Sequence, residues 1–487
     1  MFVIGIIAGC LQSEEQTQTE IDQPSVEEPH TPQPSSISNQ GQQMAPQNGP
    51  NGNREGGPKG PPNDQTQKGP QGPPNDQSQN GPPGPAPLSG PNAATAGSGG
   101  AFQDPSGFPP FHDWPAPEGP AIDKMGQWGE VKQLTKRPTG GYRPQIAVGE
   151  NDWLHVVYYD RTDQGDIIRH RISKDSGDGW TEPNQLGHDS ERNWGPDIIA
   201  LEDGSVIVVY DHALEDFTSR GFMTVYNDGS WSTPTPLTPD DGGEIGSGHI
   251  AQAQGDNLAY IYIAKQVGPE HKFQARYRWF DGNDWSSPTA LSDGLEDAWH
   301  TNVERRPDGT VLAGYDIGTG GAATTLFLVQ GVGSSFEAPQ DITRSGKSGE
   351  RPHFAFQESG EDVVTWFHKE KGQPTHIYVR YGQNGSWGEI DEPSKGYGGY
   401  HFDPEIAVND DGVYCLVWGW DSGDDAELVY AINSGGGWSA PQKVADLNWG
   451  KPGLASLDVD SNGQFHVVWN QGVRGYNEVY YSTLGVQ

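Results

Sequence analysis

The sequence predicts an all-β fold: a seven-bladed β-propeller of four-stranded blades, closed by an N-terminal strand, behind a disordered N-terminal tether. Three observations predict it. An aromatic residue that follows a Gly/Asp/Asn/Ser-rich turn recurs every 51 to 54 residues from position 128 onward. Each unit holds short runs with strand character. Gly and Pro number 68 and 40 of 487 residues, a composition that excludes helical bundles and, without a strict period, collagen.

The recurring aromatic residues mark the same position in each of seven repeated units. In most units Pro follows the aromatic residue by three positions and an aliphatic residue follows it by six. Asp-Gly or Asn-Gly pairs, such as Asp203-Gly204 and Asn462-Gly463, indicate tight hairpins between two of the strand runs. We therefore expect four strands per unit. The seven aromatic positions are Trp128, Trp180, Trp231, Trp285, Phe336, Trp387 and Trp438.

The phase of the units predicts how the ring closes. The last unit stops after its third strand, at Ser482, whereas Trp128 to Leu134 is a single strand with no blade ahead of it. If the early strand completes the last blade, no sheet edge is left open to pair with another chain.

One turn carries a family resemblance. Ser173-Lys-Asp175-Ser-Gly177-Asp-Gly-Trp180 fits the pattern Ser-x-Asp-x-Gly-x-x-Trp, and the other six turns look like shortened versions. Residues 126–487 therefore resemble the sialidase-like BNR/Asp-box β-propeller superfamily. The resemblance implies that this Asp-box is structural: Ser173 and Asp175 bind backbone amides while Trp180 packs between blades.

The N-terminus predicts export and a lipid anchor. Residues 1–10 form a short apolar run ending in Ile7-Ala8-Gly9-Cys10, which resembles a lipoprotein signal and implies lipid attachment to Cys10. The alternative is an ordinary apolar N-terminus. Residues 11–125 are rich in Gln, Pro, Gly and Asn, cannot bury enough apolar surface to fold, and are interpreted as a disordered linker. We therefore expect an extracellular or cell-surface protein whose propeller spans residues 126–487.

Net charge and cysteine content exclude some classes of partner and of fold. The chain has 30 Lys+Arg against 66 Asp+Glu, a formal charge of −36, and no basic cluster, which argues against nucleic acid. No stretch approaches the roughly 20 apolar residues of a membrane-spanning helix, so membrane contact is expected only through the lipid. Two cysteines, Cys10 and Cys415, cannot form a disulfide framework. We expect a monomer.

Blade topology predicts where a site could form. The Asp-box turns lie at one face, so the starts of the innermost strands and the loops between second and third strands should surround the central mouth at the other face. The candidate substrate-binding residues there are Arg143, Trp194, His249, Arg351, Asp403, Trp420 and Lys451. The candidate catalytic residues are His300, His353, Tyr400 and His401.

These residue types favour recognition of an acidic sugar. Guanidinium groups bind carboxylates, imidazoles exchange protons, and indoles stack on sugar rings. The structural alternative is that Arg143-Pro144, Arg351-Pro352 and Lys451-Pro452 form one repeated turn whose basic residue only satisfies carbonyl groups. No spacing identifies a metal site, and no motif indicates a cofactor.

Three functions remain open at this stage. The first is a surface-anchored propeller that binds an acidic glycan, favoured by blades too regular to form a lid that would exclude water. The second is a glycan-degrading enzyme, either a uronate polysaccharide lyase or a sialidase-type glycoside hydrolase, although Tyr142-Arg-Pro144 departs from the sialidase motif Phe/Tyr-Arg-Ile-Pro. The third is a scaffold for protein partners.

Overall fold

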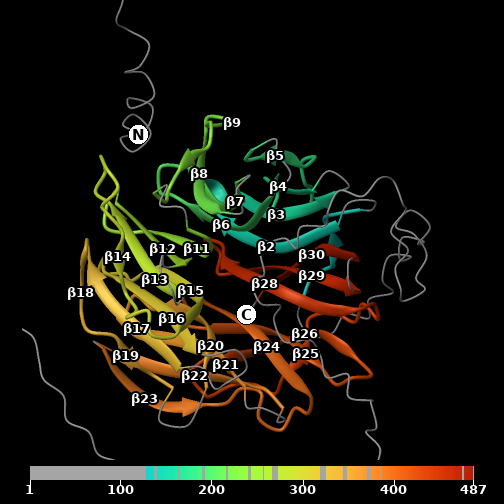
Figure 1. Cartoon of the computed structure of the whole chain (residues 1–487). Coiled ribbons are helices and arrows are strands. Elements are labelled where there is room, and N and C mark those ends of the chain that lie inside the picture. Colours follow the sequence, from blue (N-terminus) through green and yellow to red (C-terminus); the bar gives the residue numbers. More distant parts are fainter. Residues whose placement is uncertain are drawn as a thin grey trace, which may run out of the picture. The chain divides into compact units, whose positions relative to one another are not determined.

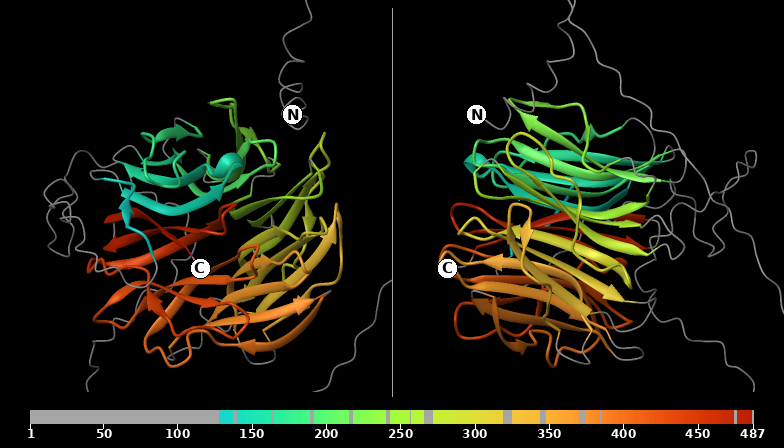
Figure 2. Two further views of the ribbon diagram at one scale, coloured as in Figure 1. Left: turned by 180° about the vertical axis from the view of Figure 1, so that it is seen from behind. Right: turned by 60° about the vertical axis from the view of Figure 1, so that its left-hand side comes forward.

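The computed structural model contains seven antiparallel sheets arranged as blades around a central axis (Figure 1). Figure 2 shows the same ring from behind and from the side. The seven-bladed prediction is confirmed. The structure describes residues 128–485 except 137–139, 163–164, 189–191, 215–217, 240–242, 256, 266–271, 319–324, 344–347, 370–373, 384 and 474–475. Cys10 and the linker predicted at 11–125 lie outside these residues.

Each blade contributes one strand to each of four concentric layers. The innermost strands are β2 (Gly140–Val148), β6 (Asn193–Ala200), β11 (Ile245–Gln252), β15 (Asp297–Arg305), β20 (Glu350–Phe356), β24 (Tyr400–Val408) and β28 (Lys451–Val459). The second strands are β3 (Leu154–Thr162), β7 (Val206–Ala213), β12 (Leu258–Lys265), β16 (Val311–Gly318), β21 (Asp362–His368), β25 (Tyr414–Asp421) and β29 (Phe465–Val473).

The two outer layers complete the blades. The third strands are β4 (Gly165–Ser173), β8 (Ser219–Asn227), β13 (Phe273–Phe280), β17 (Thr325–Val332), β22 (His376–Gln383), β26 (Ala426–Asn433) and β30 (Tyr476–Leu484). The outermost strands are β5 (Asn184–Leu186), β9 (Ser230–Trp231) with β10 (Thr235–Pro236), β14 (Thr289–Ala290), β18 (Ser335–Phe336) with β19 (Gln340–Asp341), β23 (Ser386–Asp391), β27 (Gln442–Lys443) and β1 (Lys132–Gln133). In blades 2 and 4 the outermost strand is split into two short pieces.

The last blade is closed by the N-terminal strand, as predicted. β1 pairs with β30, with Lys132 opposite Tyr481. Thr135 reinforces the closure: its Oγ1 donates to Glu478 Oε2 at 2.5 Å and accepts a hydrogen bond from the Val479 amide at 2.9 Å. A strand that is distant in sequence therefore covers what would be an open edge of blade 7.

Packing between blades explains the spacing of the repeat. In four units the aromatic residue lies against a ring on the third strand of the preceding blade. Trp180 of blade 1 contacts Tyr481 of blade 7, with ring centroids 5.1 Å apart and nearly perpendicular. Phe336 of blade 4 contacts Tyr277 of blade 3 at 4.4 Å. These aromatic side chains thus join two sheets.

The Asp-box of blade 1 has the geometry of a hydrogen-bonded turn. The Gly177 amide donates to Ser173 Oγ at 2.8 Å, and the Gly179 amide donates to Asp175 Oδ1 at 2.7 Å. Trp180 Nε1 donates back to the Gly177 carbonyl at 3.2 Å. These side chains are occupied by backbone groups of their own turn, on the face opposite the starts of the innermost strands.

Helical structure is minimal among the described residues. It is confined there to a three-residue 3₁₀ turn, Glu150–Asp152, which links β2 to β3. Within this part of the chain, no helix has the length and apolarity needed to cross a bilayer.

Replacing Trp128 by Ala tests the closure. The side chain is 3% exposed and packs edge-on against Tyr430 of blade 6, with centroids 5.4 Å apart. Loss of a buried indole should lower the free energy of unfolding by about 3–5 kcal/mol in chemical denaturation. Leu295→Ala, at a side chain that is 74% exposed, serves as control, with an expected change within about 0.5 kcal/mol. Equal small effects of both variants would contradict the closing role.

Candidate functional site

The innermost strands share an irregularity that turns side chains toward the axis. In each of the seven blades the pairing of the first and second strands shifts register by a bulge near the start of the inner strand. In five blades the bulge residue has a left-handed backbone conformation: Arg143 (φ 48°), Gly195 (φ 58°), Ser247 (φ 51°), Arg351 (φ 57°) and Asp403 (φ 50°). Bulges re-aim side chains in this way next to functional sites.

We call the end of the axis at these bulges the mouth. His300 belongs to it because the bulge of blade 4 lies between Ala298 and Thr301. The mouth thus gathers Arg143 from blade 1, His300 from blade 4, Arg351 from blade 5 and Asp403 from blade 6. Residues that are far apart in the chain are brought to one opening.

His300 is held by a buried carboxylate. Its Nδ1 lies 2.8 Å from Oδ2 of Asp316, a residue of β16 whose side chain is fully buried. The same oxygen accepts the Arg351 amide at 3.0 Å. This contact favours the tautomer in which Nδ1 carries the proton, so Nε2 is left as an acceptor. Burial lowers the pKa of His300, with Asp316 opposing the shift, and the neutral imidazole therefore predominates at pH 7.

The two mouth arginines differ in their surroundings. Arg351 Nε lies 2.8 Å from Asp403 Oδ1, and both side chains are less than one-fifth exposed. Arg143 makes no ion pair with another described residue, and its amide donates to Asn470 Oδ1 at 3.2 Å. Burial lowers the pKa of Arg143, and the positive charge of Arg351 adds to that shift.

The contacts of Arg143, Arg351 and Lys451 do not support the alternative in which all three residues occupy one repeated turn and satisfy backbone carbonyl groups. Arg143 and Arg351 occupy the same bulge position, but Lys451 precedes the bulge of blade 7, where Pro452 is still paired. Among the described residues, no backbone carbonyl accepts a hydrogen bond from the guanidinium of Arg143 or Arg351. The Lys451 ammonium pairs with Asp421 instead.

Below the mouth, the axis is a polar channel of about 360 Å³. One side chain from each blade, at the equivalent register of the inner strand, forms a ring in its wall. The volume lies within the range of small-ligand sites. The seven ring residues are Gln145, Asp197, His249, Asn302, His353, Glu405 and Ser456.

Contacts within the ring join neighbouring blades. His353 Nδ1 lies 2.9 Å from Glu405 Oε2 and 2.9 Å from Asn302 Nδ2. His249 Nδ1 lies 3.5 Å from Asp197 Oδ2, which also accepts the Ile250 amide at 2.9 Å. These imidazoles are therefore partly engaged by carboxylates of the same ring.

Two carboxylates line the channel two residues beyond the ring. Asp458 Oδ2 accepts the Val148 amide at 2.7 Å, and burial raises the pKa of Asp458 to about 6. Glu304 faces the channel space. Desolvation by the channel wall, together with the negative charges of Asp197 and Asp458, holds the pKa of Glu304 well above its usual range. The channel is thus acidic, in contrast to the arginines at the mouth.

Three predicted histidines are not mouth residues. His249 and His353 lie deeper, in the channel ring. His401 is fully buried: its Nε2 donates to the Tyr397 carbonyl at 2.7 Å, and its Nδ1 accepts Trp418 Nε1–H at 2.9 Å. Both ring nitrogens are used, and burial lowers the pKa of His401 to about 4. This placement corrects the expectation that His401 faces a ligand, because the bulge between Phe402 and Glu405 reverses the alternation of side chains along β24.

The remaining candidates lie at the periphery of the mouth. Tyr400, the first residue of β24, is 39% exposed. Trp420 donates through Nε1 to the Gly398 carbonyl at 2.5 Å and lies 5.1 Å from the Tyr397 ring. Trp194 is half-buried at the start of β6. Of the predicted set, the structure brings Arg143, Arg351, His300 and Asp403 together most directly.

Sequence reasoning missed most of the channel wall. Gln145, Glu304, Glu405 and Ser456 were not selected because they lie inside runs that resemble ordinary strands. A signal for them exists in the sequence: they stand at fixed distances from the hairpin turn of each repeat. Aligning the seven repeats on that turn, rather than on the start of the strand, would have found the ring.

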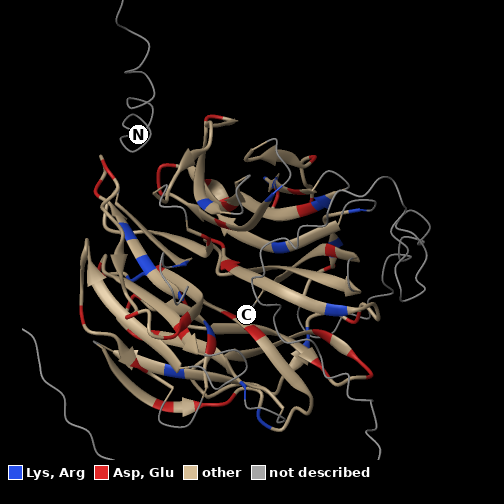
Figure 3. Ribbon diagram, viewed as in Figure 1, with Lys and Arg blue, Asp and Glu red and all other residues tan. Residues whose placement is uncertain are grey.

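Several positive charges around the mouth lie beside carboxylates. Figure 3 shows acidic residues on every blade, with basic residues interspersed. Around the mouth, Lys265 lies 3.0 Å from Glu244 and Lys272 lies 3.1 Å from Asp297. Each of these charges, like Arg351, has a carboxylate beside it.

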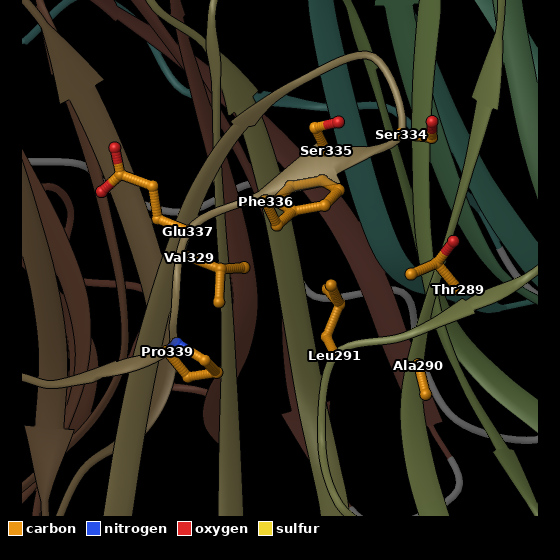
Figure 4. Close-up of a pocket in the computed structure, with 9 residues that line it drawn as sticks. All are labelled: Thr289, Ala290, Leu291, Val329, Ser334, Ser335, Phe336, Glu337 and Pro339. Atoms are coloured by element: carbon orange, nitrogen blue, oxygen red, sulfur yellow. The ribbon is translucent and has the colours of Figure 1, made fainter.

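A second hollow lies on the outer side of the ring, between blades 3 and 4 (Figure 4). It has a volume of about 430 Å³, and Leu291, Val329, Phe336 and Pro339 contribute to its lining. Glu337 is the single charged residue among those that line it. It offers no group of titratable side chains, so the mouth and channel remain the candidate site.

Comparisons with known proteins report fold likeness alone. No family model and no curated protein matches the chain. Among solved structures, it is similar to a protein of unknown function from Dyadobacter fermentans (15% identity, 73% of this chain and 99% of that chain, TM-score 0.48). It is also similar to an α-L-arabinanase of Penicillium chrysogenum complexed with arabinobiose (12%, 75% and 98%, 0.47). A third is a Hadza microbial sialidase (12%, 68% and 77%, 0.42). Likeness this weak carries no argument about ligand or reaction.

Proposed function

We propose that this propeller binds an acidic saccharide at the mouth. The observation that carries the proposal is the convergence of Arg143, Arg351 and His300, from blades 1, 5 and 4, on one end of an axial channel. Guanidinium groups bind carboxylates through paired N–H donors, and a neutral imidazole accepts from sugar hydroxyls. The channel ring adds amide, imidazole and carboxylate groups that suit further hydroxyls.

Binding an anion at Arg351 requires an exchange of partners. Asp403 already lies 2.8 Å from Arg351 Nε, so an incoming carboxylate competes with it for the same guanidinium. Arg143, which has no ion-pair partner among the described residues, is the more available of the two. The competition disfavours weak anions and favours a ligand that contacts both arginines at once.

Two substitutions at one ion pair test this role. Arg351→Gln should weaken binding of an oligogalacturonate, a uronate oligosaccharide, by about ten-fold or more because it removes a charge-assisted donor. Asp403→Asn breaks the same ion pair but frees Arg351, so it should leave affinity unchanged or increase it. Isothermal titration calorimetry measures both.

The matched control lies at the other end of an inner strand. Arg305, the last residue of β15, is 3.7 Å from Glu202, and Arg305→Gln should not alter binding. If Arg351→Gln and Asp403→Asn weaken binding equally, the ion pair is structural and the proposed role of Arg351 is wrong. A large loss of stability in Arg351→Gln would support the same conclusion.

Catalysis at the same site is a second candidate, and the His300–Asp316 contact is the observation that favours it. A neutral imidazole with Nδ1 held by a buried carboxylate is arranged as a general base. On a uronate, Nε2 would take the proton from the carbon that bears the carboxylate. The carbon–carbon double bond would form as the bond to the glycosidic oxygen breaks, and the leaving oxygen would receive a proton.

An absorbance assay distinguishes binding from elimination. If the propeller is a lyase, incubation with polygalacturonate or another uronate polysaccharide produces unsaturated ends that absorb in the ultraviolet. His300→Asn should then lower the rate by about 100-fold or more while binding persists. Sialosides, assayed for free sialic acid, test the hydrolase alternative. Binding without product in either assay selects the non-catalytic function.

We further propose that the propeller is displayed at the cell surface on a lipid attached to Cys10. The residues that support this are the apolar run that ends in Ile7-Ala8-Gly9-Cys10 and the polar linker behind it. Cys10→Ser should move the protein from the membrane pellet to the soluble fraction of the host and abolish incorporation of a labelled fatty acid. Unchanged labelling and sedimentation would contradict the anchor.

The Asp-box residues Ser173, Asp175, Gly177 and Trp180 are assigned a structural role only.

A further inference from the structure

One carboxyl group near the mouth has no visible partner. Asp211, on β7, is 1% exposed, and both of its carboxyl oxygens lack a hydrogen-bond donor among the described residues. It also forms no ion pair with them. Burying an ionised carboxylate without a partner is costly, so a carboxyl group in this position is favoured in its protonated, neutral form.

Asp211 and Arg143 both lie close to Gly195, which has no side chain. Gly195 occupies the bulge position of blade 2, where Arg143, Ser247 and other residues stand in other blades. A Cβ at Gly195 would lie 3.2 Å from Asp211 Oδ2 and 3.9 Å from Arg143 Nη1. Asp211 Oδ2 and Arg143 Nη1 therefore both lie close to this point, although no hydrogen bond joins the two side chains.

The equivalent residue of blade 4 shows the contrast. Asp316 stands at the same register of the second strand as Asp211, and it contacts His300 and the Arg351 amide. Asp316 Oδ2 thus has two nitrogen partners, whereas Asp211 has no hydrogen-bond donor among the described residues. Burial raises the pKa of Asp211 to about 7, and Arg143 only partly opposes that shift. Asp211 therefore changes charge near neutral pH.

Other titratable groups lie on the strand of Asp211 and on the neighbouring elements. On its own strand, His212 is neutral near pH 7 because burial lowers its pKa to about 4. On β12, burial raises the pKa of Tyr260 well above its usual range, so the phenol stays neutral. Asp197 on β6, Tyr262 on β12 and Arg278 on β13 act on Tyr260. Tyr159 on β3, Arg351 and Asp403 act on Arg143.

We propose that the protonation state of Asp211 regulates anion binding at the mouth: neutral Asp211 leaves Arg143 free to bind the ligand, and ionised Asp211 neutralises Arg143 and repels the ligand. This inference rests on the proposed function, because it concerns the same ligand. It makes Asp211 a positioning residue that acts through Arg143 and does not touch the ligand itself.

The coupling has a defined sign. A ligand that prefers the protonated form binds best at low pH, and its affinity falls by up to about ten-fold per pH unit as pH rises through the pKa of the linked group. A uronate stays ionised above about pH 5, so its own charge does not change in the useful range. Affinity should therefore decline between about pH 6 and pH 8.5.

Asp211→Asn in the full chain is the decisive variant. Asn has the shape of the neutral carboxyl and cannot ionise, so binding of the oligogalacturonate probe should keep its low-pH affinity up to about pH 8.5. Glu427→Gln is the matched control, because burial also raises the pKa of Glu427 to about 7 but its Oε1 contacts the Leu447 and Asn448 amides on blade 6. This control should reproduce the pH profile of the wild type.

Gly195→Ser provides an independent variant. Ser247 occupies the same bulge position with φ 51°, so this backbone conformation accepts serine. The new hydroxyl would lie beside Asp211 Oδ2, stabilise the ionised form, and move the midpoint of the affinity decline to lower pH.

The outcomes separate the two proposals. A pH slope in Asp211→Asn equal to that of the wild type, or no shift in Gly195→Ser, overturns the regulation while binding itself stands. No binding by the wild type at any pH overturns the proposed function, and the regulation with it. A flat profile in Asp211→Asn with a normal profile in Glu427→Gln supports the proposal.

Discussion

The aromatic contact between successive blades is the interaction on which the rest of the structure depends. A single four-stranded sheet has two faces to cover, and in this protein each sheet covers its neighbour. Trp180 against Tyr481 and Phe336 against Tyr277 are examples of a contact that four of the units make. Because every blade needs a neighbour on both sides, the ring must close, and β1 closes it by completing blade 7. Stability and the convergence of distant residues have this common origin.

The mouth follows from closure combined with one local irregularity. Seven inner strands enter the axis side by side, and the bulge near the start of each re-aims one side chain. The same bulge holds an arginine in blades 1 and 5, a serine in blade 3, an aspartate in blade 6 and a glycine in blade 2. A uniform backbone therefore presents a varied set of groups, and chemistry at the mouth can change by substitution without altering the blades.

Electrostatics divides the axis into two regions. The mouth carries arginines whose charge is partly balanced by Asp403, while the channel below carries Asp197, Glu405 and Asp458. The channel is therefore more acidic than the mouth. Asp316 Oδ2 contacts His300 Nδ1 and accepts the Arg351 amide, whereas neither carboxyl oxygen of Asp211 has a hydrogen-bond partner among the described residues. Two aspartates at equivalent positions therefore differ in their hydrogen-bond partners.

The sequence by itself determined the number of blades, their four strands, the closing strand and the face on which the bulge residues lie, because hairpin turns and period-two alternation are local properties. It also identified Arg143, Arg351, His300 and Asp403, since these stand at the starts of inner strands. Only the tertiary structure decided which side chains reach the axis. It placed His401 inside a blade and brought Glu304 and Glu405 into the channel. A shift of one residue at a bulge reverses the face of every side chain beyond it, and that shift depends on pairing with the second strand rather than on the inner strand's own residues.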